Sequence, residues 1–107
     1  MIDVFIVELM QYIESLTEKY NLYEVQIIVF MENEYDEHYK QHTLILELSP
    51  INYKVSKLSK KIQELISSNN ISIVEHDILK MGKKYFKDPA IDFNTEEHSL
   101  FVNISYD

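Results

Sequence analysis

Between Ile51 and Ile66, apolar residues recur every three or four positions, the spacing that places them on one face of a helix. Ser49 suits the N-cap of that helix, and Pro50 suits its first turn because a backbone N–H there would have no partner. The polar run at residues 67–70 is expected to end the helix, since Ser and Asn side chains compete for backbone partners.

A second apolar stripe of the same period predicts a helix over residues 2–20. Asp3 is a suitable N-cap, and Asn21 is a suitable stop. Val4 and Val7 fall outside the stripe. Either the first turn is not helical, which we favour, or a small apolar patch is left for a partner.

Four runs of β-branched or alternating apolar residues predict strands. They span residues 22–31, 41–48, 71–79 and 99–106. The acidic segment 32–40 is either a loop or an extension of the first two strands. Residues 80–97 form a longer connection, which we interpret as a hairpin arm that turns at Asp88 and Pro89.

The resulting order α-β-β-α-β-β predicts a single α+β domain, residues 1–107, with a four-stranded antiparallel sheet and two helices on one face. A shift of 49 residues lays the first helix on the second and Val29 on Ile78, which favours an αββ duplication. The opposite face of the sheet either binds a partner or a second copy, or is covered by the arm at 80–97. On the first strand, that face would carry Gln26, Ile28 and Phe30.

Charge is segregated along the chain, whose formal net charge is −8. Residues 1–49 carry a net charge of −8, residues 50–87 carry +5, and residues 88–107 carry −5. One-sided fields of this kind steer partners of opposite sign.

The densest acidic patch lies in the first strand connection and combines carboxylates with tyrosines. Carboxylates dock the Lys and Arg side chains of another protein, and tyrosine adds rigid contact area and a cation-binding ring face. The alternative is a hairpin tip that its charges keep soluble. The predicted partner-binding residues are Glu32, Glu34, Tyr35, Asp36, Glu37 and Tyr39, with a second patch at Asp92, Glu96 and Glu97.

The lysines favour a different function, a regulatory or nucleic-acid-binding module that contacts phosphates. Arginine, the residue best shaped for phosphate, is absent, and the net charge repels polyanions, so this function ranks second. The ridge would consist of Lys54, Lys57, Lys60, Lys61, Lys80, Lys83, Lys84 and Lys87.

Little in the sequence indicates catalysis, a metal or a cofactor. Cysteine is absent, and Gly82 is the single glycine, which excludes thiolate chemistry and a glycine-rich phosphate loop. His38 and His42 have the spacing of two helical metal ligands, but the expected context is a strand connection. His76 and His98 have acidic neighbours, and they could pair with these or bind a metal only if the fold brought the side chains together. We predict a non-enzyme without a cofactor or metal.

No apolar run reaches the length of a membrane span and no basic leader is visible, so we expect a cytoplasmic protein. In gross character, this small, acidic, cysteine-free chain resembles bacterial immunity proteins that neutralise basic toxins and phage anti-CRISPR proteins that block defence nucleases. The resemblance implies a non-catalytic inhibitor that occupies a cationic surface. The expected partner is a basic protein, such as a nuclease or a nucleic-acid-binding effector, and a homodimer is an alternative use of the apolar sheet face.

Overall fold

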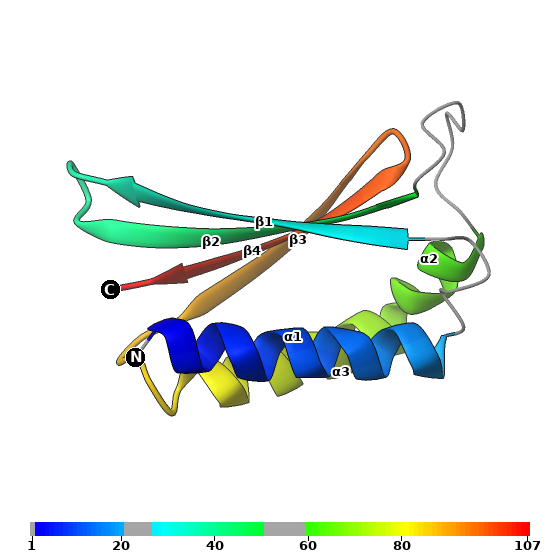
Figure 1. Cartoon of the computed structure of the whole chain (residues 1–107), viewed down its shortest axis with the longest axis horizontal. Coiled ribbons are helices and arrows are strands. Elements are labelled where there is room, and N and C mark those ends of the chain that lie inside the picture. The colour runs from blue at the N-terminus through cyan, green and yellow to red at the C-terminus, as the bar shows by residue number, and fades with distance from the viewer. Residues whose placement is uncertain (1, 21–26, 51–59) are drawn as a thin grey trace.

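The computed structural model describes residues 2–20, 27–50 and 60–107, which form three helices and one four-stranded sheet (Figure 1). In chain order the elements are α1 (Ile2–Lys19), β1 (Ile27–Asp36), β2 (Gln41–Pro50), α2 (Lys60–Leu65), α3 (Ser68–Gly82), β3 (Ala90–Glu96) and β4 (Ser99–Tyr106). The predicted α+β class and the order α-β-β-α-β-β are confirmed, with α2 and α3 together in the place of the second helix.

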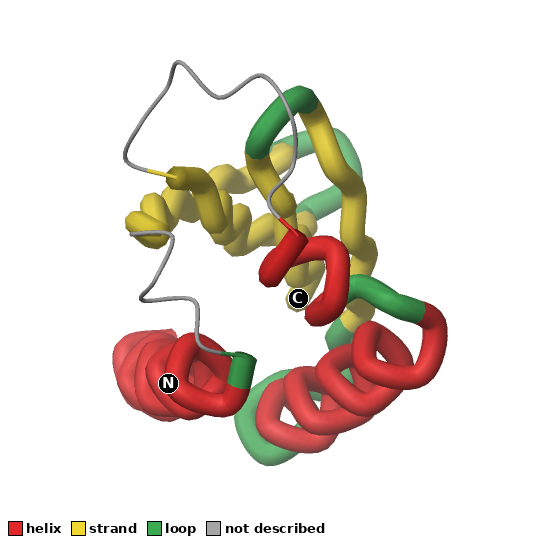
Figure 2. Tube along the Cα trace, turned by 90° about the vertical axis from the view of Figure 1, so that its right-hand side faces the viewer, coloured by secondary structure: helices red, strands yellow, loops and turns green. Residues whose placement is uncertain are grey.

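The four strands run antiparallel to their neighbours in the order β1-β2-β4-β3. Each hairpin supplies one outer and one inner strand, and the pairing of β2 with β4 joins the hairpins at the centre. Helices α1 and α3 lie side by side against one face of the sheet, as predicted (Figure 1, Figure 2). We call the opposite side the open face, because none of the described helices lies on it. None of these helices has the length and apolar character needed to cross a membrane.

The core lies between the sheet and the helices, because alternate residues of β2 and β4 point toward the helices. Three leucines of β2 lie opposite three aliphatic residues of β4, and each of the six is at most 2% exposed. These six residues are Leu44, Leu46, Leu48, Leu100, Val102 and Ile104. The helices complete the core with Phe5, Leu9, Ile13, Leu16, Ile62, Leu65, Val74 and Ile78.

The strand predicted at residues 71–79 is wrong, because these residues belong to α3. Their many β-branched side chains favour a strand, yet Val74 and Ile78 are four residues apart and both buried, whereas Ile73 is 51% exposed. Burial of this helical face outweighs intrinsic propensities, which differ by less than about 1 kcal/mol per residue. The third strand of the sheet is β3.

The polar run at residues 67–70 ends one helix, as predicted, and also begins the next. α2 ends at Leu65, and the Ser67 hydroxyl and the Asn70 amide donate to the carbonyl of Glu64 at 2.9 and 2.7 Å. Ser67 is at the same time the N-cap residue of α3. The Ser67 side chain makes no capping hydrogen bond to α3. Because Ser and Asn are favoured at both kinds of helix end, these residue types do not distinguish a stop from a start.

The ends of the first two strands also differ from the prediction. β1 continues through residues 32–36, so this segment is a strand extension and not a loop, while residues 22–26 lie outside the described residues. Ser49 and Pro50 belong to β2, so the helix start predicted there is wrong. Residues 51–59 lie outside the described part of the chain.

The connection at residues 80–97 does not fold over the open face. α3 continues to Gly82, and residues 90–96 form an outer strand of the sheet, so Asp88 and Pro89 join a helix to a strand and do not form a hairpin turn. The αββ order is repeated, but the alignment at a shift of 49 residues is wrong. It sets Val29, in β1, against Ile78, in α3.

Polar contacts tie α1 to α3 and to the turn that follows α3. The Tyr12 hydroxyl donates to Asp77 Oδ2 at 2.8 Å, and the Tyr85 hydroxyl donates to Glu8 Oε1 at 2.5 Å. The hydrogen bond from Tyr85 lowers the pKa of Glu8 and raises the pKa of Tyr85. Burial raises the pKa of the Tyr12 hydroxyl, and the bond to the Asp77 carboxylate raises it further.

The assignment of residues 68–82 to a helix predicts that replacing Ile78 by alanine destabilises the protein much more than replacing Ile73 by alanine. Ile78→Ala removes a side chain that is 1% exposed and is expected to lower the free energy of unfolding by about 2–5 kcal/mol. Ile73→Ala acts on a side chain that is 51% exposed and is expected to change it by less than about 0.5 kcal/mol. Urea denaturation measures both, and equal losses would contradict the assigned helix face.

The raised pKa of Tyr12 predicts that the folded protein loses stability at high pH. Because its pKa is raised on folding from an ordinary value of 10.0, its contribution is complete below pH 10 and is lost as the pH rises beyond it. Tyr12→Phe is expected to lower the free energy of unfolding by about 1 kcal/mol at pH 7 and by progressively less above pH 10. Urea denaturation across this range tests the effect, with Tyr39→Phe, at a residue 74% exposed, as the unaffected control. A Tyr12→Phe difference that does not change with pH would refute it.

Candidate functional site

The open face of the sheet joins the two acidic segments that are far apart in the sequence. Glu32 lies opposite Ile45 on β2, Ile45 opposite Asn103 on β4, and Asn103 opposite Asp92 on β3. One row of side chains therefore crosses the whole sheet between two carboxylates. With strands about 4.8 Å apart, these two positions are separated by roughly 14 Å.

The carboxylates on this face lie mainly on its two outer strands. Because residues two apart share a face, the register places three of them on β1, one on β2 and two on β3. No lysine or arginine stands on the open face of the described strands. The six are Glu32, Glu34, Asp36, Glu47, Asp92 and Glu96.

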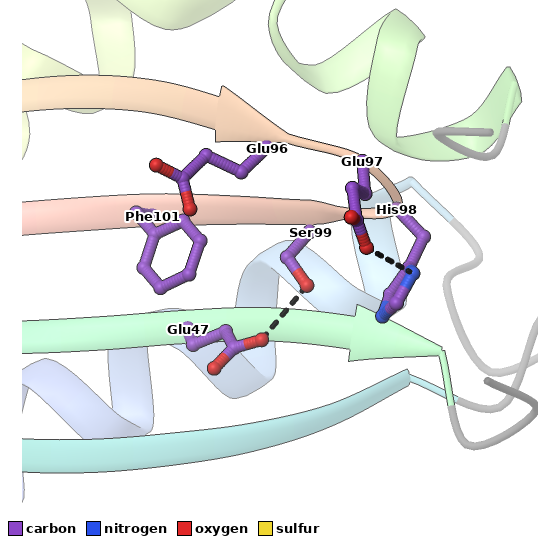
Figure 3. A pocket seen from close by; sticks show the side chains of 6 residues that line it. All are labelled: Glu47, Glu96, Glu97, His98, Ser99 and Phe101. Carbon is purple, nitrogen blue, oxygen red and sulfur yellow. Dashed lines mark hydrogen bonds and ion pairs between the residues drawn. The ribbon is translucent and has the colours of Figure 1, made fainter. Parts of the chain in front are cut away.

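The centre of the open face is partly apolar. Ile45 and Phe101 are half-buried, and with Glu47 they line a shallow hollow that begins beside Glu32. Glu47 and Phe101 also line a neighbouring hollow at the β3–β4 turn (Figure 3). There the Ser99 hydroxyl donates to Glu47 Oε2 at 2.8 Å, which fixes this central carboxylate. The open face thus consists of an apolar centre between two acidic edges.

Five of the predicted partner-binding residues lie on this face. On β1 they are Glu32, Glu34 and Asp36, and on β3 they are Asp92 and Glu96. All five side chains are exposed. Asp36 also shapes the turn after β1, because its Oδ1 accepts the backbone N–H groups of His38 at 2.9 Å and Tyr39 at 3.2 Å.

Tyr35 lies on the helix side of β1 and not with the carboxylates. It pairs with His42, which pairs with Tyr106, and the ring centroids in this row are 4.6 and 4.9 Å apart. Phe86 continues the row, 4.4 Å from Tyr106, and Phe5 lies 5.5 Å beyond it in the core. Tyr35 is therefore the exposed end of an aromatic row, with 52% of its surface accessible.

The remaining predicted residues lie in the two hairpin turns. Glu37 and Tyr39 are exposed in the β1–β2 turn, where the Tyr39 ring contacts the His38 ring edge to face at 4.7 Å. Glu97 lies in the β3–β4 turn with its Oε2 4.0 Å from His98 Nδ1 (Figure 3). These two turns lie at opposite ends of the sheet, so the structure does not gather all the predicted residues into one cluster.

Three residues of the open face are missing from the sequence-based site. Ile45, Glu47 and Phe101 occupy the two central strands. The alternation of Leu44, Leu46 and Leu48 with other residue types already placed Glu47 on the other side, but only the β2–β4 pairing shows that it adjoins Phe101.

The described lysines are not continuous in space. Lys60 begins α2, whereas Lys80 to Lys87 follow from the last turn of α3. The intervening 15-residue helix α3 is about 22 Å long. Lys84 Nζ lies 3.3 Å from Glu8 Oε2. Lys54 and Lys57 lie outside the described residues, and the described lysines do not form a single ridge.

The histidines do not assemble a metal site in the part of the chain that the structure describes, where no group of three or more His, Asp or Glu side chains is arranged to hold an ion. The His42 ring lies between two tyrosines, stacked on Tyr106 and tilted against Tyr35, while His76 is exposed on α3. Comparisons with protein-family models, curated proteins and solved structures find no match to this chain.

The crowding of carboxylates on β1 predicts that charge removal stabilises the fold. Glu32→Gln with Glu34→Gln is expected to raise the free energy of unfolding by roughly 0.2–1 kcal/mol at low salt, because like charges repel across the sheet face. In about 1 M NaCl, where the Debye length is about 3 Å, the gain should vanish. Urea denaturation at both salt concentrations measures it, with Glu18→Gln and Glu75→Gln on the helices as the matched control. A gain independent of salt would contradict an electrostatic cause.

Proposed function

We propose that this protein binds a basic protein through the open face of its sheet and acts as a stoichiometric, non-catalytic inhibitor. The observation that carries the proposal is the charge of that face, which has six carboxylates and, on its described strands, no lysine or arginine. Stable folding does not require such a concentration of like charge, so binding is the better explanation.

The arrangement of the face favours a partner that itself binds nucleic acid. Such a partner lines a groove with Lys and Arg that contact phosphates on two strands. Carboxylates on β1 and β3, separated by roughly 14 Å, offer these cations an alternative set of charge-assisted hydrogen bonds. Ile45 and Phe101 add apolar contact between the acidic edges. Nucleases and nucleic-acid-binding effectors are partners of this class, and the resemblance in composition to immunity and anti-CRISPR proteins favours the same mode of inhibition.

Charge reversal on β1 should abolish partner binding without unfolding the chain. Glu32→Lys with Glu34→Lys is expected to weaken binding by at least about tenfold, because like charges would then oppose each other in the interface. Asp36 is left unchanged because it holds the turn. The control Glu18→Lys with Glu75→Lys makes the same change in net charge on exposed helix positions and should bind normally.

The partner is obtained by affinity capture from a lysate with and without nuclease treatment, then purified and titrated calorimetrically against wild type and both variants. A basic protein that survives nuclease, is lost only with the β1 reversal and is displaced by nucleic acid supports the proposal. Equal binding by wild type and the β1 reversal would refute it. So would captured nucleic acid that depends on Lys80, Lys83 and Lys87, which would instead indicate the nucleic-acid-binding alternative.

A further inference from the structure

The outer edge of β1 is a second binding feature beside the open face. β1 is the first strand in the sheet order and, among the described strands, pairs only with β2. Every second residue along its 10-residue length directs its backbone N–H and C=O away from β2. An edge of this kind can take an added strand from another chain.

An apolar groove lies below this edge, between α1 and β1. Ile6 and Ile13 form its inner wall with Val29 of β1, and Val7 and Met10 form its outer wall. Val7 is 57% and Met10 is 38% exposed. The favoured prediction that the first turn is not helical is wrong, because α1 begins at Ile2. Val4 and Val7 are both exposed, as the alternative expected, and Val7 borders the edge strand.

The other side of the same strand is acidic. Glu32 and Glu34 point to the open face, opposite in direction to Val29 and the groove. Because side chains alternate along a strand, a segment added to β1 would direct every second side chain over the groove and the others beside the carboxylates. The two surfaces require different residue types, apolar on the groove side and cationic on the acidic side.

We propose that the β1 edge binds an extended segment of the basic partner in which apolar residues alternate with Lys or Arg. This inference rests on the proposed function and specifies how part of the partner is held. Main-chain hydrogen bonds to β1 supply affinity, while the groove and the carboxylates select the side chains.

The charges on this surface argue against a second copy as the occupant. Antiparallel pairing of β1 with its own copy would place Glu32, Glu34 and Asp36 of both chains on one face, where cross-strand carboxylates repel. The exposed strip of α1 would also bring like charges together in a dimer, since acidic Asp3 and Glu14 flank Val7 and Met10 on both sides. A basic strand satisfies these carboxylates, and a second acidic chain does not.

The test uses a labelled synthetic peptide of alternating valine and lysine, equal in length to β1, and fluorescence anisotropy with the full chain. A peptide of the same composition with its valines and lysines in separate blocks is the matched control. We expect the alternating peptide to bind at least about tenfold more tightly, because only its side chains match the two sides of β1. Equal binding of the two peptides, or no binding, overturns the inference.

N-methylation of alternate peptide bonds tests the strand geometry. In an added strand, the N–H groups of every second residue face β1 and the others face solvent. Methylating one set should abolish binding, while methylating the other should leave it within about twofold. Equal effects of the two sets overturn the inference.

Substitution in the groove separates this inference from the proposed function. Val7→Gln with Met10→Gln should weaken binding of the alternating peptide about tenfold through lost apolar contact. Ile73→Gln, at an exposed position of α3, should leave this binding unchanged.

If these groove variants bind the peptide normally and Glu32→Lys with Glu34→Lys still abolishes partner binding, the edge inference fails and the proposed function stands. If the peptide results hold and the reversal binds the partner normally, the proposed function fails, and the inference that rests on it fails as well. A stable dimer in sedimentation that the peptide dissociates would identify a second copy as the occupant and also overturn the inference.

Discussion

The pairing register of β2 with β4 is the constraint on which the remaining structure depends. It sets Leu44 against Ile104 and Leu46 against Val102, so that one side of the central strands is almost entirely aliphatic and the helices cover it. A slip of one residue would expose that set and bury the polar one, at a cost that the domain could not sustain. The composition of the open face follows from the same pairing, since whatever does not face the helices must face outward.

The sequence was most informative where the apolar positions matched the two-residue period of a strand and did not match the 3.6-residue period of a helix. The alternation around Leu46 and Val102 is strict, and the predicted strands 41–48 and 99–106 correspond to β2 and β4. At residues 71–79 the apolar positions satisfied both a strand and a helix, and contact with α1 decided between them. Local propensity does not include such a contact, because Tyr12 and Asp77 are 65 residues apart along the chain.

The candidate site was predicted as two separate acidic segments, and their residue types were identifiable from charge alone. That both segments lie on one face could not be predicted, because it requires knowing that β1 and β3 are the outer strands of one sheet. Side-chain direction was equally inaccessible for Tyr35, whose neighbours in sequence are acidic but whose neighbours in space are aromatic. The double role of Asp36 also depends on the turn geometry, which places its carboxylate beside two backbone amides.

The central position of β4 has a consequence for synthesis of the protein. β1 and β2 leave the ribosome before β3 and β4, and β2 finds its second neighbour only when residues 99–106 have been added. Until then, the leucines of β2 have a partner strand on one side only, in β1, and β3 has no strand to pair with. The nascent chain therefore carries an incomplete hydrophobic layer from the synthesis of β2 until β4 is made, and the sheet can be completed only when β4 has emerged. A chain released before this strand is made would expose Leu44, Leu46 and Leu48, a surface of the kind that chaperones and proteases recognise.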